Sequence, residues 1–141
     1  MDAELILEKI ESLRRRVQRV EDKRGDSVED LERDWDRQDI ITVNLTRAVQ
    51  LCVDISAHLI SKDDGAPPDT MAEGFDRLHE MGVLSATLAQ RLQGAVGFRN
   101  VAVHAYRSMD WQIVHSITHE RLDDFRRFAR AVLDVVEKQD L

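Results

Sequence analysis

The chain has 141 residues, with 27 acidic and 20 basic side chains and a formal net charge of -7. This length fits one domain covering residues 1–141, which can bury a core without disulfide or metal support. The acidic balance argues against a protein that binds nucleic acid through its overall charge, although a local basic cleft can still attract it. The single cysteine, Cys52, excludes a disulfide framework and favours a reducing compartment.

The amino-terminal sequence MDAELILEKIES is acidic and amphipathic, unlike a signal peptide. No apolar run approaches the length that a membrane-spanning helix needs. We therefore expect a cytoplasmic protein with no membrane partner.

Hydrophobic residues recur with helical periodicity and do not alternate as in strands. The first predicted helix runs from about residue 3 to residue 22 and ends at the sequence RGD, Arg24–Asp26, which we interpret as a turn. Ser27 with Asp30 is a weak capping signal for a second helical region. Residues 28–35 form either a short separate helix or the beginning of the next one.

A long apolar seam follows over residues 38–61, and the sequence KDDGAPPD ends that helix. Three further helices are predicted from capping residues at their amino ends, Thr70, Ser85 and Asp110, and the first of these stops at Gly82. A last helix holds Leu122, Phe125, Phe128, Val132 and Val136. The predicted fold is an all-α bundle of four to five main helices.

The segment GFRNVAVHAY, Gly97–Tyr106, places four polar side chains within an apolar string. Polar groups in an apolar setting must be paired or functional. On a regular helix Asn100 and His104 share a face, whereas Arg99 and His104 are separated by about 140°. Either the helix ends near Val103 and re-aims His104, or a second subunit supplies the missing partner.

Gly94 and Gly97 lie three residues apart in the same predicted helix. Each costs about 1 kcal/mol relative to alanine in a helix interior. Their presence indicates close packing by a partner helix or by another subunit.

The sequence RNVAVHAY, Arg99–Tyr106, resembles the R-x4-6-H motif of HEPN-domain proteins in its extended form R-x4-H-x-Y. The preceding VGF and the helix NLTRAVQLCVDISAHLI, Asn44–Ile60, resemble the HepT-like branch, and the resemblance covers nearly the whole chain. It implies a HEPN-type helical bundle that forms a homodimer, with the two motifs meeting in a cleft at the interface. It also implies a ribonuclease that acts as the toxin of a toxin–antitoxin system.

The same resemblance assigns roles to residues and partners. Arg99 and His104 are the expected catalytic residues. The expected antitoxin is a small nucleotidyltransferase of the MNT type, which modifies Tyr106 by adenylylation and forms a complex with the toxin dimer. The expected substrate is RNA, either tRNA or mRNA.

These residue types suit RNA cleavage in which the ribose 2′-OH attacks the adjacent phosphate. Histidine transfers protons near neutral pH, and arginine stabilises a charged phosphate. Two copies of His104 would supply a base and an acid, and Asn100 would orient the phosphate, the 2′-OH or the imidazole. Asp54 lies on the polar stripe of the long helix, which either faces the cleft and orients His104 or is a solvated helix face. We expect no metal ion and no other cofactor.

Other side-chain groups leave alternatives open. His115 and His119 have the spacing of two metal ligands, but no third ligand is specified. Trp35 and Trp111 are expected to anchor packing. Four arginines cluster in the first predicted helix: Arg14, Arg15, Arg16 and Arg19. Three interpretations stay open for this cluster: it guides RNA, it binds the antitoxin, or it forms a solvated helix face.

An alternative function is a non-catalytic helical subunit that binds substrate or nucleotide for a nucleotidyltransferase. A purely structural helical dimer is the third hypothesis. The segment Gly97–Tyr106 argues against a purely structural role, because a scaffold has no need for an arginine, an asparagine, a histidine and a tyrosine in this spacing.

Overall fold

The computed structural model describes residues 3–63 and 66–139, and the described residues contain helices and no strand. Four long helices and several short ones follow one another along the chain. They are α1 (Ala3–Lys23), α2 (Val28–Arg33), α3 (Trp35–Ser61), α4 (Met71–Glu80), α5 (Ala86–His104), the 3-10 helix η1 (Tyr106–Ser108), α6 (Trp111–Glu120) and α7 (Leu122–Gln139). The predicted all-α bundle of four to five main helices is confirmed.

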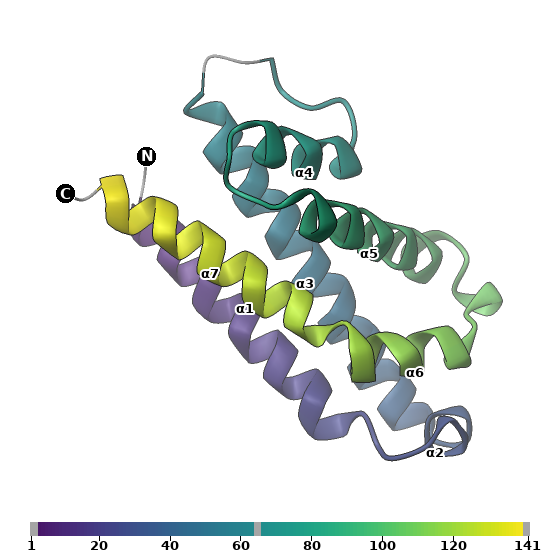
Figure 1. Ribbon diagram of the computed structural model, residues 1–141. Helices are drawn as coiled ribbons and strands as arrows, with labels where there is room; N and C mark the ends of the chain where they lie inside the picture. The colour runs from purple at the N-terminus through teal and green to yellow at the C-terminus, as the bar shows by residue number, and fades with distance from the viewer. Residues whose placement is uncertain (1–2, 64–65, 140–141) are drawn as a thin grey trace.

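Helix α3 lies at the centre of the bundle (Figure 1). It packs against α1 on one side and against α4 and α5 on another, while α7 lies along α1. Phe75 of α4 and Phe128 of α7 meet edge to face, with ring centroids 6.2 Å apart, so the core continues from one side of the bundle to the other. Both rings are almost fully buried.

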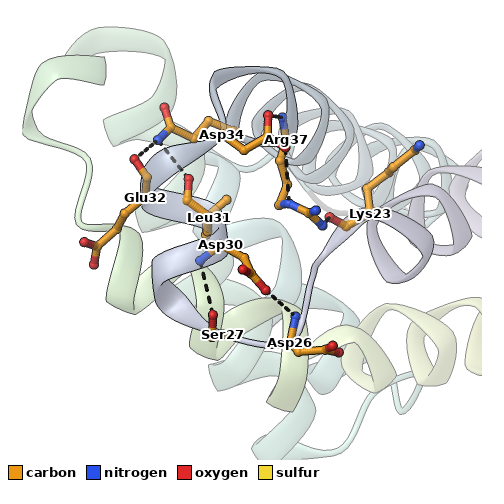
Figure 2. Close-up of polar contacts among 9 residues, drawn as sticks. Lys23, Asp26, Ser27, Asp30, Leu31, Glu32, Asp34 and Arg37 are labelled. Atoms are coloured by element: carbon orange, nitrogen blue, oxygen red, sulfur yellow. Dashed lines mark hydrogen bonds and ion pairs between the residues drawn. The ribbon is translucent and has the colours of Figure 1, made fainter.

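A tight corner joins α1, α2 and α3. Figure 2 shows the Ser27 hydroxyl accepting a hydrogen bond from the Asp30 N–H at the start of α2. The Asp34 carboxylate accepts from the Arg37 N–H and so starts α3 directly after α2. The Arg37 guanidinium also donates to the Lys23 carbonyl at 2.6 Å. These caps make residues 28–33 a separate short helix, which decides between the two sequence-based alternatives.

The other predicted helix starts are confirmed by their hydrogen bonds. Thr70, Ser85 and Asp110 each accept a backbone N–H from the first turn of the helix that follows. Gly82 has a φ of 80°, the left-handed conformation that commonly ends a helix, and α4 stops two residues before it. Helix α3 ends at Ser61 as predicted, although two residues of the KDDGAPPD segment, at positions 64 and 65, lie outside the described residues.

Helix α3 is long and apolar enough to cross a membrane by length and composition alone, with a mean hydropathy of 1.3 over its most apolar window. The prediction that no apolar run approaches that length is therefore wrong. Half of this window is buried inside the bundle. A helix surrounded by α1, α4 and α5 must be apolar on several faces, so its composition follows from its central position.

Candidate active site

The R-x4-H-x-Y motif lies at the carboxyl end of α5. The helix includes His104, and Ala105 follows as the capping residue, donating its N–H to the Val101 carbonyl at 2.9 Å. Tyr106 then begins η1. The helix thus does not end before His104, so re-aiming by a loop applies to Tyr106 only. Arg99 and His104 remain on different faces of one helix.

The motif side chains of α5 leave much of their hydrogen-bonding capacity free. The Arg99 Nη1 donates to the Asn100 Oδ1 at 3.2 Å, and the Arg99 Nε is buried without a hydrogen-bond partner among the described residues. No carboxylate in the described part of the chain pairs with this guanidinium. Asn100 and His104 are exposed. An arginine, an amide and an imidazole are therefore available to a ligand.

Tyr106 is held against the amino-terminal part of α3. Its hydroxyl donates to the Asp39 carboxylate at 3.4 Å, and its ring meets Trp111 edge to face with centroids 6.0 Å apart. The side chain remains 41% exposed. Burial raises the pKa of the Tyr106 phenol, the Asp39 carboxylate raises that pKa further, and the Thr42 hydroxyl opposes the rise. The phenol therefore stays protonated near neutral pH while the side chain remains partly exposed to solvent.

Asp39 was not among the sequence-predicted site residues. It lies 67 residues before Tyr106 in the sequence, and no spacing rule connects the two positions. Only the fold, which packs α5 against α3, brings the Tyr106 side chain within reach of Asp39. Trp111 is confirmed as a packing residue, whereas Trp35 is 80% exposed and its predicted anchoring role is wrong.

The structure does not bring Asp54 to His104 within one chain. The Asp54 carboxylate accepts from the Gln50 amide at 2.9 Å and lies 4.0 Å from the Lys9 ammonium of α1. It also lies 15 residues beyond Asp39, about 22 Å along a helix that rises about 1.5 Å per residue. The polar stripe of α3 is thus directed toward α1, so the predicted supporting role of Asp54 would require a second chain.

The glycines of α5 face open space. An added Cβ at Gly94 or Gly97 would meet no atom within 4 Å, so none of the described helices packs against them. Beside them, between α5 and α6, are two hollows of about 310 and 240 Å³, both lined by Phe98 and by Ile113, which is 58% exposed. Gly97 and His104 are seven residues apart, so they lie within about 20° of one another around the helix. The open glycine face and the motif histidine therefore point the same way.

The remaining candidates have structural settings. Cys52 is fully buried, and burial raises the pKa of its thiol far above the ordinary value, so it behaves as a core residue. The rings of His115 and His119 lie 4.2 Å apart, and burial together with the His115 charge lowers the pKa of His119. Within the described ranges, no group of three or more His, Cys, Asp or Glu side chains could hold a metal ion.

A family model described as ribonuclease HepT-like matches residues 6–132 of this chain. The chain belongs to the ribonuclease HepT-like family. The matched range extends from α1 into α7 and includes the R-x4-H-x-Y segment. The HepT-like resemblance of the motif is thereby confirmed.

Two curated HepT-like relatives are nucleases by name. The mRNA nuclease HepT of Shewanella oneidensis is 28% identical over 136 residues, covering 96% of this chain and 98% of the relative. The tRNA nuclease HepT of Aphanizomenon flos-aquae is 28% identical over 96 residues, covering 67% of this chain and 65% of the relative. These two relatives are thus named for different classes of RNA.

A solved structure shares this HepT-like fold. It is the tri-AMPylated Shewanella oneidensis HEPN toxin in complex with its MNT antitoxin. The superposition has a TM-score of 0.87 at 28% identity and covers 95% of this chain and 98% of that toxin. The arrangement of the helices around α3 is therefore that of a HEPN toxin.

Proposed function

We propose that this chain is the ribonuclease toxin of a toxin–antitoxin pair and that Arg99 and His104 carry its chemistry. The observation that supports this most is the motif at the end of α5 in a HepT-like fold, where His104 is exposed and Arg99 has no carboxylate partner among the described residues. The proposed substrate is tRNA or mRNA, the two classes of RNA in the names of its relatives. RNA cleavage by the purified chain tests the proposal, and the cytoplasm is the proposed location.

The proposed reaction is attack of a ribose 2′-OH on the adjacent phosphate. A histidine accepts the proton of the 2′-OH, and a second histidine donates a proton to the departing 5′ oxygen. Arg99 stabilises the added negative charge on the equatorial phosphate oxygens, for which a guanidinium is well shaped. Asn100, bonded to Arg99, orients the phosphate or the nucleophile. These steps need proton donors and acceptors but no redox or metal chemistry.

A homodimer completes this site in our proposal. One chain supplies one motif histidine, and its Arg99 lies on another face of α5. A second copy that packs on the open glycine face would approach His104, because Gly97 and His104 point the same way. The exposed Ile113 and the apolar hollows beside α5 provide surface for such contact. The observed open space at Gly94 and Gly97 is what supports an interface there.

Replacing Gly97 by tryptophan should weaken the dimer and its activity together. A Cβ at this position meets no atom within 4 Å in the described chain, so we expect the helix itself to fold. It would obstruct a second chain, and we expect the dimer dissociation constant to rise at least about tenfold, a loss of about 1.4 kcal/mol. Sedimentation velocity measures this directly. Glu137→Trp, at an exposed position of α7, is the control; equal dimerisation of both variants would contradict the proposed interface.

Neutralisation is proposed to proceed through an MNT-type nucleotidyltransferase that adenylylates Tyr106. The Tyr106 side chain is 41% exposed and is the last residue of the motif, so added AMP would bring bulk and negative charge to a phosphate-binding cleft. The structure of the related toxin carries AMP groups and holds an MNT antitoxin, and a larger toxin–antitoxin complex is proposed here as well.

Incubation of the chain with the antitoxin and ATP should add one or more AMP units to its intact mass. Tyr106 is the only tyrosine in the sequence, so a tyrosine adduct can be assigned to it without ambiguity. Tyr106→Phe should acquire no adduct, and its RNA cleavage should not be inhibited by incubation with the antitoxin and ATP. An unchanged adduct on Tyr106→Phe would place the modification elsewhere.

A further inference from the structure

A second basic site lies on α1, away from the motif. A groove of about 320 Å³ is lined by side chains of α1 and by one residue of α3: Ser12, Arg15, Arg16, Arg19 and Asn44. We call it the α1 groove. Every residue that lines it is polar, and no acidic side chain is among them. It is therefore a concave surface rich in hydrogen-bond donors, on a protein whose net charge is -7.

The arginines of the α1 groove form no ion pair in the described part of the chain. No carboxylate in the described part of the chain lies within ion-pair distance of Arg15, Arg16 or Arg19. Other arginines of this acidic chain do have such partners, as Arg91 has in Asp124 and Arg126 has in Glu21. The guanidinium groups of the groove therefore present an uncompensated positive charge.

The back of the α1 groove is held rigidly. Asn44 is 6% exposed and donates its amide to the Ile40 carbonyl at 2.7 Å. Its Oδ1 accepts a hydrogen bond from the Arg16 Nη1 at 3.2 Å. The buried amide thus fixes the Arg16 side chain while leaving most of its five N–H donors free. An arginine oriented in this way loses less entropy when it binds a ligand.

We propose that the α1 groove binds phosphodiesters of the RNA chain on which this protein acts. Guanidinium groups match the oxygens of a phosphate in charge and geometry. A groove that binds a protein would be expected to centre on apolar or aromatic side chains, and none lines this one. The proposal rests on the ribonuclease function proposed above and names a contact for a segment of RNA outside the reacting phosphate.

The α1 groove and the motif contact different faces of α3. Asn44 lies five residues beyond Asp39, the partner of Tyr106, so the two are about 7.5 Å apart along the axis and about 140° apart around it. One phosphate cannot occupy both places. The groove therefore serves the flanking part of the RNA, attracting and orienting it before the reacting phosphate enters the motif.

The test is RNA binding by a chain that cannot cleave. In a His104→Ala background, the affinity for a fluorescently labelled single-stranded RNA is measured by anisotropy at several salt concentrations. Arg15→Gln and Arg19→Gln should each weaken binding about tenfold, because each removes a charge-assisted hydrogen bond to a phosphate. Each should also flatten the slope of log affinity against log salt by about 0.7. Arg14→Gln, exposed on the same helix but outside the groove, is the matched control.

The outcomes separate this inference from the proposed function. Equal affinity and equal salt slope in all variants would overturn the α1 groove as an RNA site, even if the wild-type chain cleaves RNA. Loss of antitoxin binding in Arg15→Gln or Arg19→Gln with unchanged RNA binding would also overturn it and make the groove a protein site. Failure of the wild-type chain to cleave any RNA would instead contradict the proposed function. Circular dichroism checks that each variant folds.

Discussion

Replacement of His104 by alanine should reduce the rate of RNA cleavage by at least about 100-fold, and by up to about 10,000-fold, the range for one proton-transfer group. The loss should be large because both proton transfers are assigned to copies of this residue in the dimer. The free energy of unfolding should change by no more than about 0.5 kcal/mol, because His104 is exposed at the end of α5. The variant therefore separates chemistry from folding.

Cleavage rates under single-turnover conditions, with thermal unfolding of the same samples, provide the measurement. His119→Ala is the matched control, since His119 is also exposed near the end of a helix but lies outside the motif. Full activity in His104→Ala would rule out the assigned role. Nucleotide binding by the wild-type chain with no cleavage of any RNA would instead favour a non-catalytic subunit of a nucleotidyltransferase.

Replacement of Arg99 by alanine should reduce kcat/KM by about 100- to 1,000-fold, the usual effect of removing one preorganised donor to developing charge. The Arg99 guanidinium has no carboxylate partner in the described chain, and its one hydrogen bond runs to the neighbouring Asn100. Its charge is therefore available to the phosphate. Arg99→Lys should recover only part of the activity, because lysine keeps the charge but not the planar pair of donors.

Steady-state kinetics on one RNA substrate compare the Arg99 variants with Arg107→Ala. Arg107 is exposed in η1, three residues beyond His104, and carries the same charge. A loss of similar size in Arg107→Ala would mean that local positive charge, and not the planar pair of donors of Arg99, determines the rate. Wild-type activity in Arg99→Ala would remove this residue from the mechanism.

Local sequence predicted most of the helices and their amino-terminal caps. Ser27, Thr70, Ser85 and Asp110 each cap the helix that was predicted to follow, because a cap needs only a side-chain acceptor and a backbone N–H two or three residues away. The apolar seam of α3 could be predicted for a similar reason, because helical periodicity depends only on residues close in sequence. The motif Arg99–Tyr106 was likewise visible, because its residues are close in sequence.

Tertiary structure decided what the motif faces. Asp39 reaches Tyr106 across 67 positions, and Arg16 reaches Asn44 across 28, only because helices distant in sequence pack side by side. The sequence predicted that Asp54 lies on the polar face of α3. The structure shows that this carboxylate pairs with Lys9 of α1, a neighbour that the periodicity of α3 alone could not indicate.

The glycines of α5 show the same division. Their sequence predicted a close approach by a partner helix or by another subunit. The fold leaves Gly94 and Gly97 open, so no described helix of the chain approaches them, and contact with a second subunit stays a prediction. Sequence fixes which residues share a helix face, because the helix repeat is local. Which neighbour covers that face depends on how all the helices bury their apolar surface together, and only the folded bundle decides it.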